Sequence, residues 1–201
     1  MTIVATSDVE QEHWLRGRNV AGVDEAGRGS LAGPVVAAAV VLRSDVPIPG
    51  LADSKMLRAE RRQELAAVIT QLARAHATAF VWSDRIDEVN ILQATFDAMH
   101  QAVDGVAEGA DHLLIDGNRF RKHRLPHTCI IGGDARCVSI AAASILAKVA
   151  RDTWMVEVAH QRWPMYGFDR HKGYGTEAHR RAITEYGPCE IHRRLFLRKL
   201  Q

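Results

Sequence analysis

The stretch that decides the fold is NVAGVDEAGRGSLAGPVVAAAVVL, residues 19–42. It opens with a short apolar segment, Asn19–Val23, and closes with a longer apolar run, Pro34–Leu42. Both segments predict buried β-strands, because short valine-rich runs bounded by turn residues are typical of strands in a protein interior. The glycine-rich segment Ala26–Gly33 between them predicts a tight turn. We therefore expect two successive strands joined at one end by a glycine turn.

Outward from this pair, apolar runs and helical periodicities alternate along the chain. The expected strands are Ala77–Trp82, His112–Ile115 and Thr128–Ile131. The expected helices are Arg58–Arg74, Asp84–Val89 with Ser83 as its cap, Ile91–Val106, Val138–Arg162 and Thr176–Tyr186. Residues 1–18 show no clear periodicity and predict a loose N-terminal extension. This order favours one mixed α/β sheet with helices on its faces.

Acidic residues stand at the ends of several of these apolar segments. Asp24 and Glu25 end the first strand, Asp116 ends the HLLI strand, and Asp134 follows two glycines. Since ligands of open α/β sheets bind outside strand ends, these carboxylates can serve one site. Without His or Cys they suit hard cations such as Mg²⁺ or Mn²⁺, and two such ions can promote in-line displacement at a phosphodiester. The alternative for each acid taken singly is a helix cap or a solvated turn.

The glycine turn Gly27–Gly33 has a second possible interpretation, as a dinucleotide-binding fingerprint. Its third glycine comes one residue late, however, and a strand-like run follows where that motif requires a helix. No Gly-Lys-Ser/Thr sequence is present, which excludes a P-loop. Glycines can still bring bare backbone close to a sugar-phosphate chain, and a plain tight turn is the simpler alternative.

The composition indicates an ordinary globular protein. The chain has 201 residues, 47% of them hydrophobic and 25% charged, enough for one domain with a sizeable core. Its longest nearly uncharged stretch, Gly29–Leu42, is too short to span a bilayer. The opening MTIVATSDVEQEHW has acids where a secretory signal needs bases, and the three cysteines are scattered without a Cys-x-x-Cys pair. We therefore expect a cytoplasmic protein with neither a membrane segment nor a disulfide framework.

Basic residues concentrate at the C-terminal end. Arg170–Gln201 holds eight Lys/Arg against three Asp/Glu, a net charge of +5, whereas the preceding 169 residues carry −3. A basic region on a near-neutral body favours a polyanionic partner such as nucleic acid. A solvated basic helix face is the alternative.

Taken together, these segments resemble type 2 ribonuclease H (ribonuclease HII). The resemblance runs in order from about Val20 to Phe196 through GVDEAGRGSLAGPVV, ADSKML, LIDGN, GGDA, SIAAASILAKVARD, YGFDRHKGYGT and HRRLF. It implies a ribonuclease H-like fold, a central mixed β-sheet flanked by α-helices with a helical C-terminal region. It also implies an endoribonuclease that uses Mg²⁺ or Mn²⁺ in a two-metal site.

The activity implied by the resemblance has two substrates. The family cuts the RNA strand of RNA–DNA hybrids, and it incises duplex DNA 5′ of an embedded ribonucleotide, leaving 3′-hydroxyl and 5′-phosphate ends. Its four metal-binding, catalytic acids match Asp24, Glu25, Asp116 and Asp134.

Seven further positions match the family's substrate contacts: Gly27, Arg28, Gly29, Lys55, Ser144, Lys148 and Tyr174. The Gly27-Arg28-Gly29 turn matches the segment whose backbone reads the ribose 2′-hydroxyl, the group that distinguishes RNA from DNA. Tyr174 matches a tyrosine that stacks on the sugar of the following deoxynucleotide. Lys55, Ser144 and Lys148 match positions near the phosphates; without the resemblance, Lys148 is more simply explained as a surface lysine.

Five positions depart from the family's usual pattern. Ser30 replaces a proline, Met56 and Gly132 each replace a lysine, and Ala142 and Leu195 each replace a serine. Because each phosphate-facing lysine adds salt-dependent affinity, we expect a weaker or altered grip on the substrate with intact chemistry.

The resemblance also suggests how the chain is divided and what it meets. We expect an N-terminal extension at 1–18, a ribonuclease H-like catalytic domain at 19–186, and a basic C-terminal tail packed on that domain at 187–201. The expected partners are RNA–DNA hybrids and DNA duplexes containing ribonucleotides, with the chain a monomer that needs no obligate protein partner. Two alternatives stay open: a catalytically weakened nucleic-acid-binding homologue, or another two-metal nuclease on the same fold.

Overall fold

A five-stranded β-sheet forms the centre of the computed structural model, which describes residues 5–198. The spatial order of its strands is β3-β2-β1-β4-β5. Strand β1 pairs antiparallel with β2 and parallel with β4, while β2–β3 is antiparallel and β4–β5 is parallel. The strands are β1 (Val20–Ala26), β2 (Val35–Val41), β3 (Ala75–Val81), β4 (His112–Asp116) and β5 (His127–Ile130). The expected central mixed sheet is confirmed.

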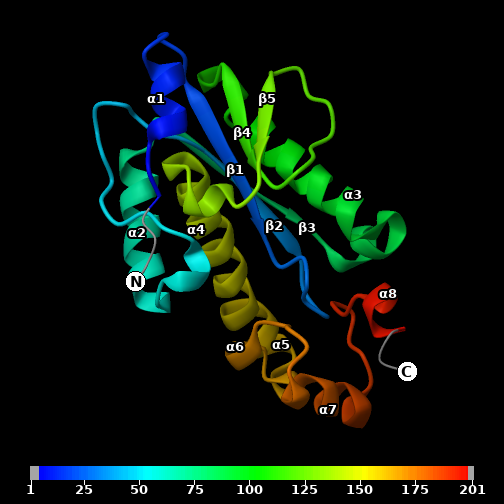
Figure 1. Ribbon diagram of the computed structural model, residues 1–201. Helices are drawn as coiled ribbons and strands as arrows, with labels where there is room; N and C mark the ends of the chain where they lie inside the picture. Colours follow the sequence, from blue (N-terminus) through cyan, green and yellow to red (C-terminus); the bar gives the residue numbers. More distant parts are fainter. Residues whose placement is uncertain (1–4, 199–201) are drawn as a thin grey trace.

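Helices cover both faces of the sheet and extend beyond one end of it (Figure 1). The α-helices are α1 (Asp8–Trp14), α2 (Ala59–Leu72), α3 (Ser83–Asp104), α4 (Val138–Trp154), α5 (His160–Arg162), α6 (Phe168–His171), α7 (Glu177–Tyr186) and α8 (Arg194–Leu197). Short 3₁₀ turns are η1 (Ser54–Met56), η2 (Ala107–Gly109), η3 (Gly133–Ala135) and η5 (Pro164–Tyr166). Within residues 5–198, no helix combines the length and apolarity that a membrane crossing requires.

The hydrophobic core lies in two layers, one on each face of the sheet. Side chains of β2 alternate between them: Ala37 and Ala39 pack with α3, whereas Ala38 and Val40 pack with α2 and α4. Because both faces are covered, all seven residues of β2 are buried. This burial explains why the strand is a continuous apolar run and lacks the alternation of a half-exposed strand.

Helix α4 crosses β1 at very close range, and a glycine makes the approach possible. A Cβ atom on Gly22 would lie only 2.1 Å from the carbonyl carbon of Ser139. Any side chain at this position would therefore push the helix away from the strand. The contact fixes the helix that carries Ser144 and Lys148 against the strand that carries Asp24 and Glu25.

The helix expected over residues 138–162 is present and includes one irregularity. A π-helical segment, η4 (Met155–Ala159), lies between α4 and α5. Met155 and Ala159 of this segment pack with Tyr166 and Phe168 in a third apolar cluster. The C-terminal helices therefore have a small core of their own at the far end of α4 (Figure 1).

The expectation of a loose N-terminal extension is wrong for its described part. Helix α1 forms there, and its Glu10 is fully buried, with Oε1 accepting hydrogen bonds from the Ser139 amide at 2.8 Å and the Ser139 hydroxyl at 2.6 Å. Thr6 adds a β-bridge to Cys137. These long-range contacts leave no periodic apolar pattern, so local sequence could not reveal them. Residues 1–4 lie outside the described part, and the domain boundaries stay predictions.

Around α3, the expected cap is wrong and the expected helical continuation is confirmed. Ser83 does not cap the helix: it is the first helical residue, and its hydroxyl donates to the Glu190 carbonyl at 3.3 Å. The expected helical continuation from Asp84–Val89 to Ile91–Val106 is confirmed as one element, which Asn90 interrupts with a φ of 70° and a ψ of 163°. The Asn90 side chain accepts hydrogen bonds from the amides of Leu92 and Gln93, and so caps the second segment.

Candidate active site

The parallel pairing of β1 with β4 places three of the predicted carboxylates at one edge of the sheet. Val23 stands opposite Ile115 in the last pair between β1 and β4, so the next residues, Asp24 and Asp116, lie side by side where this pairing ends. Glu25 follows Asp24 as the penultimate residue of β1. The Asp24 carboxylate accepts a hydrogen bond from the Glu25 amide at 2.7 Å, which holds it at the strand end.

The fourth predicted carboxylate, Asp134, reaches this edge from the 3₁₀ turn η3. The turn is tied to β4 by the Gly133 amide, which donates to Asp116 Oδ1 at 2.7 Å. The ammonium group of Lys55 lies 3.2 Å from Asp134 Oδ2 and 3.6 Å from Asp53 Oδ1. Lys55 is itself placed by a local cap, because Asp53 accepts a hydrogen bond from the Lys55 amide at 2.9 Å.

Burial and mutual repulsion make these carboxylates reluctant to ionise. The pKa of Asp24 is raised well above its usual range, first by burial and then by the charges of Glu25 and Asp116. Burial likewise raises the pKa of Glu25, although Arg28, 3.2 Å away, opposes the shift. Burial and the charge of Asp134 raise the pKa of Asp116. The cluster therefore has an excess of negative charge that a cation would relieve.

The carboxylates in turn raise the pKa of the Lys55 ammonium group. Burial alone would lower this pKa, but the hydrogen bond and charge of Asp134 outweigh burial and raise it. The charges of Asp53 and Asp24 add to the rise. Lys55 is thus a fixed positive charge beside the carboxylates, a role that its place in the sequence did not reveal.

A cavity of about 550 Å³ opens at this edge of the sheet. Three predicted acids and all seven predicted substrate contacts line it: Asp24, Glu25, Asp116, Gly27, Arg28, Gly29, Lys55, Ser144, Lys148 and Tyr174. The remaining predicted acid, Asp134, does not line the cavity, but it forms an ion pair with Lys55, which does. The structure therefore brings together residues that are more than a hundred positions apart in the chain.

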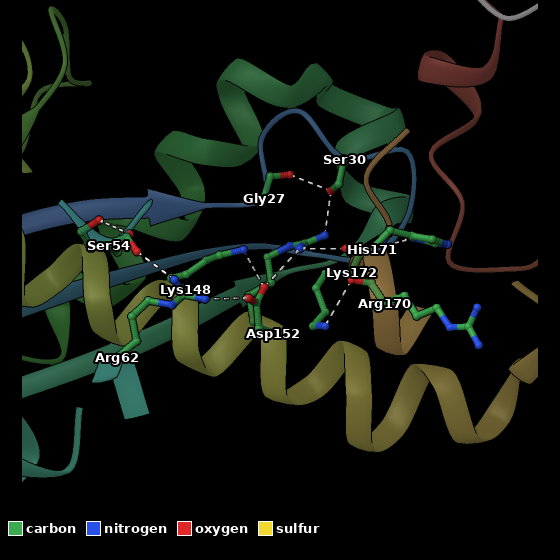
Figure 2. Close-up of polar contacts among 12 residues, drawn as sticks. Gly27, Ser30, Ser54, Arg62, Lys148, Asp152, Arg170, His171 and Lys172 are labelled. Carbon is green, nitrogen blue, oxygen red and sulfur yellow. Dashed lines mark hydrogen bonds and ion pairs between the residues drawn. The ribbon is translucent and has the colours of Figure 1, made fainter. Parts of the chain in front are cut away.

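The basic side chains that line the cavity come from four segments: Arg28 from the glycine turn, Lys55 from η1, Arg62 from α2 and Lys148 from α4. Ser144 shares a hydrogen bond of 2.9 Å with Ser54, which holds η1 against the helix. Lys148 donates to Asp152 at 2.8 Å, one helical turn away. Arg62, which the sequence did not single out, lies 4.0 Å from Asp152 (Figure 2).

A second cavity, of about 470 Å³, adjoins the first and shares Arg62, Lys148 and Tyr174 with it. It is also lined by Arg170 and Lys172 (Figure 2). Positive side chains therefore continue past Tyr174, in the direction of the basic C-terminal region.

Tyr174 rests on two cations. Lys148 Nζ and Arg151 Cζ each lie 5.2 Å from the centre of its ring, within the range of cation–π attraction. Arg151 is completely buried and, like Arg62, was not predicted as a site residue. Sequence patterns could not single it out, because its partners are mostly backbone carbonyls far away in the chain.

The donor set suits a hard cation. Within residues 5–198, no three His, Cys, Asp or Glu side chains lie close enough together to form a ready-made ion site. The buried carboxylates nevertheless offer oxygen ligands only, and the raised pKa values of Asp24, Glu25 and Asp116 show that positive charge would stabilise them. The residues present therefore fit an oxygen-seeking divalent ion.

Comparison with known proteins places this site in a family. The family model described as Ribonuclease HII matches residues 21–199. A Ribonuclease HII of Burkholderia thailandensis is 54% identical over 180 residues, which cover 90% of this chain and 84% of that protein.

Solved structures share the fold. Ribonuclease H2 from Pyrococcus horikoshii has a TM-score of 0.71 and 26% identity, covering 90% of this chain and 96% of that one. The PCNA:RNase HII complex from Archaeoglobus fulgidus has a TM-score of 0.74 and 24% identity, covering 88% of this chain and 94% of that one. Bst-RNase HIII in complex with Mn²⁺ has a TM-score of 0.59 and 24% identity, covering 85% and 63%.

The family match spans the sheet, the carboxylate edge and the C-terminal helices, and the Burkholderia relative is similar over almost the whole chain. The chain therefore belongs to the ribonuclease HII family, and it is an endoribonuclease with a ribonuclease H-like fold.

Proposed function

We propose that this endoribonuclease cuts the RNA strand of RNA–DNA hybrids and also incises duplex DNA on the 5′ side of a single embedded ribonucleotide. The products would carry 3′-hydroxyl and 5′-phosphate ends. One observation carries the proposal: a single cavity is lined by carboxylates, a glycine turn, basic side chains and the half-buried Tyr174. These are the groups needed to bind a ribose within a phosphate backbone and to hydrolyse the bond beside it.

The proposed catalytic residues are Asp24, Glu25, Asp116 and Asp134, which would hold two divalent ions, Mg²⁺ or Mn²⁺. The presence of Mn²⁺ in the Bst-RNase HIII structure supports a metal site of this kind. When bound, the ions would prepare a water molecule for attack and neutralise charge on the departing 3′ oxygen. The pKa values of Asp24, Glu25 and Asp116, raised by burial, favour an ion over free carboxylates.

The chain's own residues would fix the substrate around that centre. Lys55 from η1 and Lys148 from α4 would contact phosphates, with Ser144 on the same face of α4 as Lys148. Arg28 is half exposed at the cavity rim and is oriented by Glu25 at 3.2 Å. The backbone of the turn that contains Arg28 would bind the ribose 2′-hydroxyl, and the Tyr174 ring would pack on the next sugar.

The expected partners are the two nucleic acids. The complex of an archaeal RNase HII with PCNA shows that one structural relative meets a protein partner. Our expectations that this chain is a cytoplasmic monomer and needs no obligate protein partner stay predictions.

A cleavage assay on a labelled duplex tests the proposal and separates it from the two alternatives. We expect cuts 5′ of a single ribonucleotide only with Mg²⁺ or Mn²⁺ present, and loss of cleavage when the ion is chelated. A two-metal nuclease of another kind would also cut the matched all-DNA duplex. A catalytically weakened homologue would bind the ribonucleotide duplex without metal-dependent turnover. Either result would refute the proposal.

A further inference from the structure

Beneath the glycine turn lies a buried positive charge with an unusual set of partners. The Arg151 guanidinium donates to the carbonyl oxygens of Pro34 at 2.9 Å, Lys172 at 3.0 Å and Ala32 at 3.0 Å. Its remaining hydrogen bond goes to the Ser30 hydroxyl at 2.7 Å. A buried guanidinium with these partners is costly to desolvate, and burial lowers its pKa. The cost of burying this charge indicates that the group is retained for the conformation it imposes on the turn.

Ser30 passes this constraint on to the turn. Its side chain is fully buried and donates to the Gly27 carbonyl at 2.9 Å while accepting from Arg151 (Figure 2). Gly27 itself lies directly on the guanidinium: a Cβ there would be 2.0 Å from Arg151 Nε, and its φ is +90°. Only glycine fits this position, both because of the contact and because of the backbone angle.

A second buried arginine holds the next peptide of the turn. Arg193, from the C-terminal segment, donates to the Arg28 carbonyl at 2.9 Å and to the Gly33 carbonyl at 3.0 Å. Arg193 is fully buried, and desolvation lowers the pKa of its guanidinium to about 9. Two consecutive carbonyls of the turn, those of Gly27 and Arg28, thus point toward buried donors.

The orientation of these carbonyls determines where the neighbouring amides point. In a planar trans peptide the N–H lies opposite the C=O, so the amides of Arg28 and Gly29 point away from the buried donors. Gly27, Arg28 and Gly29 all line the cavity. Within the described residues, neither amide donates to another protein group. Two adjacent, unpaired N–H groups beside a cavity can donate to an oxygen atom that enters it.

We propose that Ser30 and Arg193 are positioning residues for ribose selectivity, which aim the amides of Arg28 and Gly29 at the 2′-oxygen of the substrate. Ser30 holds the Gly27 carbonyl with the support of Arg151, and Arg193 holds the Arg28 carbonyl. Arg151 also lies under the Tyr174 ring, so one guanidinium supports both groups that face the sugars. This inference rests on the proposed function, because it assumes that the cavity receives a ribonucleotide.

Binding measurements in an Asp116→Asn background, which blocks cleavage, test the inference. The quantity measured is the Kd for an all-DNA duplex divided by the Kd for the same duplex with one ribonucleotide. Ser30→Ala is expected to lower this ratio roughly 3- to 10-fold, the effect of weakening about one hydrogen bond. Ser30→Thr, which keeps the hydroxyl, is expected to restore most of it. Affinity for the all-DNA duplex should change little, because the amides would contact only the 2′-oxygen.

A matched control and a second variant make the outcome decisive. Ser83→Ala removes another buried hydroxyl that donates to a carbonyl but neither lines the cavity nor contacts the glycine turn, and it should leave the ratio unchanged. Arg193→Lys keeps the charge but removes the forked donors, and should also lower the ratio; it decides the matter if Ser30→Ala fails to fold. An unchanged ratio in the folded Ser30 or Arg193 variant, or an equal fall of the ratio in Ser83→Ala, overturns the inference but leaves the proposed function standing. A parent protein with no ribose preference refutes the proposed function, and the inference with it.

Discussion

Acidification to about pH 5 is expected to destabilise the C-terminal helices through two buried histidines. The Cys189 amide donates to His192 Nδ1 at 2.9 Å, so the proton of His192 must sit on Nε2. That nitrogen lies 3.1 Å from His179 Nε2, and His179 Nδ1 then donates to the Tyr174 carbonyl at 3.0 Å. The chain of hydrogen bonds requires both rings to be neutral.

The magnitude follows from the pKa values. Burial lowers the pKa of His179 and of His192 from 6.5 to about 4. The unfolded chain therefore binds protons between pH 6.5 and 4 where the folded chain does not, and stability falls as the pH falls through this range. At pH 5 the loss amounts to about 2 kcal/mol for one histidine. Because the rings share a hydrogen bond, both together should lose less than twice that amount.

Denaturant unfolding at pH 7.5 and pH 5, for wild type and His179→Asn, measures this effect. Asn keeps a donor for the Tyr174 carbonyl and cannot be protonated in this range. The pKa values of Asp24, Glu25 and Asp116 are raised by burial, so these groups favour folding as the pH falls; they are present in both proteins and cancel in the comparison. We expect the acid-induced loss of unfolding free energy to be about 2 kcal/mol smaller in His179→Asn. Equal losses in the two proteins would refute the reasoning.

Three further predictions follow from the site and its support. Asp116→Asn should lower the cleavage rate at least about a thousandfold through loss of metal-assisted charge stabilisation. Its Tm should stay unchanged or rise, because burial and Asp134 disfavour the charged form of Asp116, and an unfolded variant would show that Asp116 is structural. Met56→Lys, at a position 60% exposed beside the cavity, should steepen the salt dependence of duplex binding by about 0.9 in log–log slope, and an unchanged slope would show that this side chain does not face phosphate. Gly22→Ala should cost more than about 3 kcal/mol in urea unfolding, because its Cβ would overlap α4, whereas Gly29→Ala, with nothing within 4 Å, serves as the control and should cost little.

Prediction from sequence succeeded where a local pattern was sufficient. The strand within residues 34–42 and the long helix beginning at Val138 are both present. Each segment has enough apolar residues of its own to indicate that it is buried. The gathering of Asp24 and Asp116 needed one further fact, that β1 and β4 are parallel neighbours, which sequence spacing alone cannot supply. The resemblance of the motifs supplied it indirectly.

What escaped prediction depends on contacts between distant segments. Arg151 and Arg193 look like surface arginines in the sequence, yet both are fully buried, because carbonyl groups of the glycine turn surround them. Gly132, which stands where the family usually has a lysine, has a φ of +64°, a backbone angle that favours glycine. A lysine there would therefore strain the backbone as well as add charge. The structure therefore makes Met56 the cleaner position for testing the lost lysines.

Glu10 connects the short first helix, α1, to the start of α4. Its carboxylate accepts from the Ser139 amide and hydroxyl in the first turn of α4, where the helix's own N-cap residue, Cys137, offers no side-chain hydrogen bond. The first turn of the helix that carries Ser144 and Lys148 is thus capped by a carboxylate from the N-terminal segment of the chain. A shortened enzyme beginning at residue 19 would keep every motif, yet it would leave frayed the very helix on which phosphate binding is expected to depend.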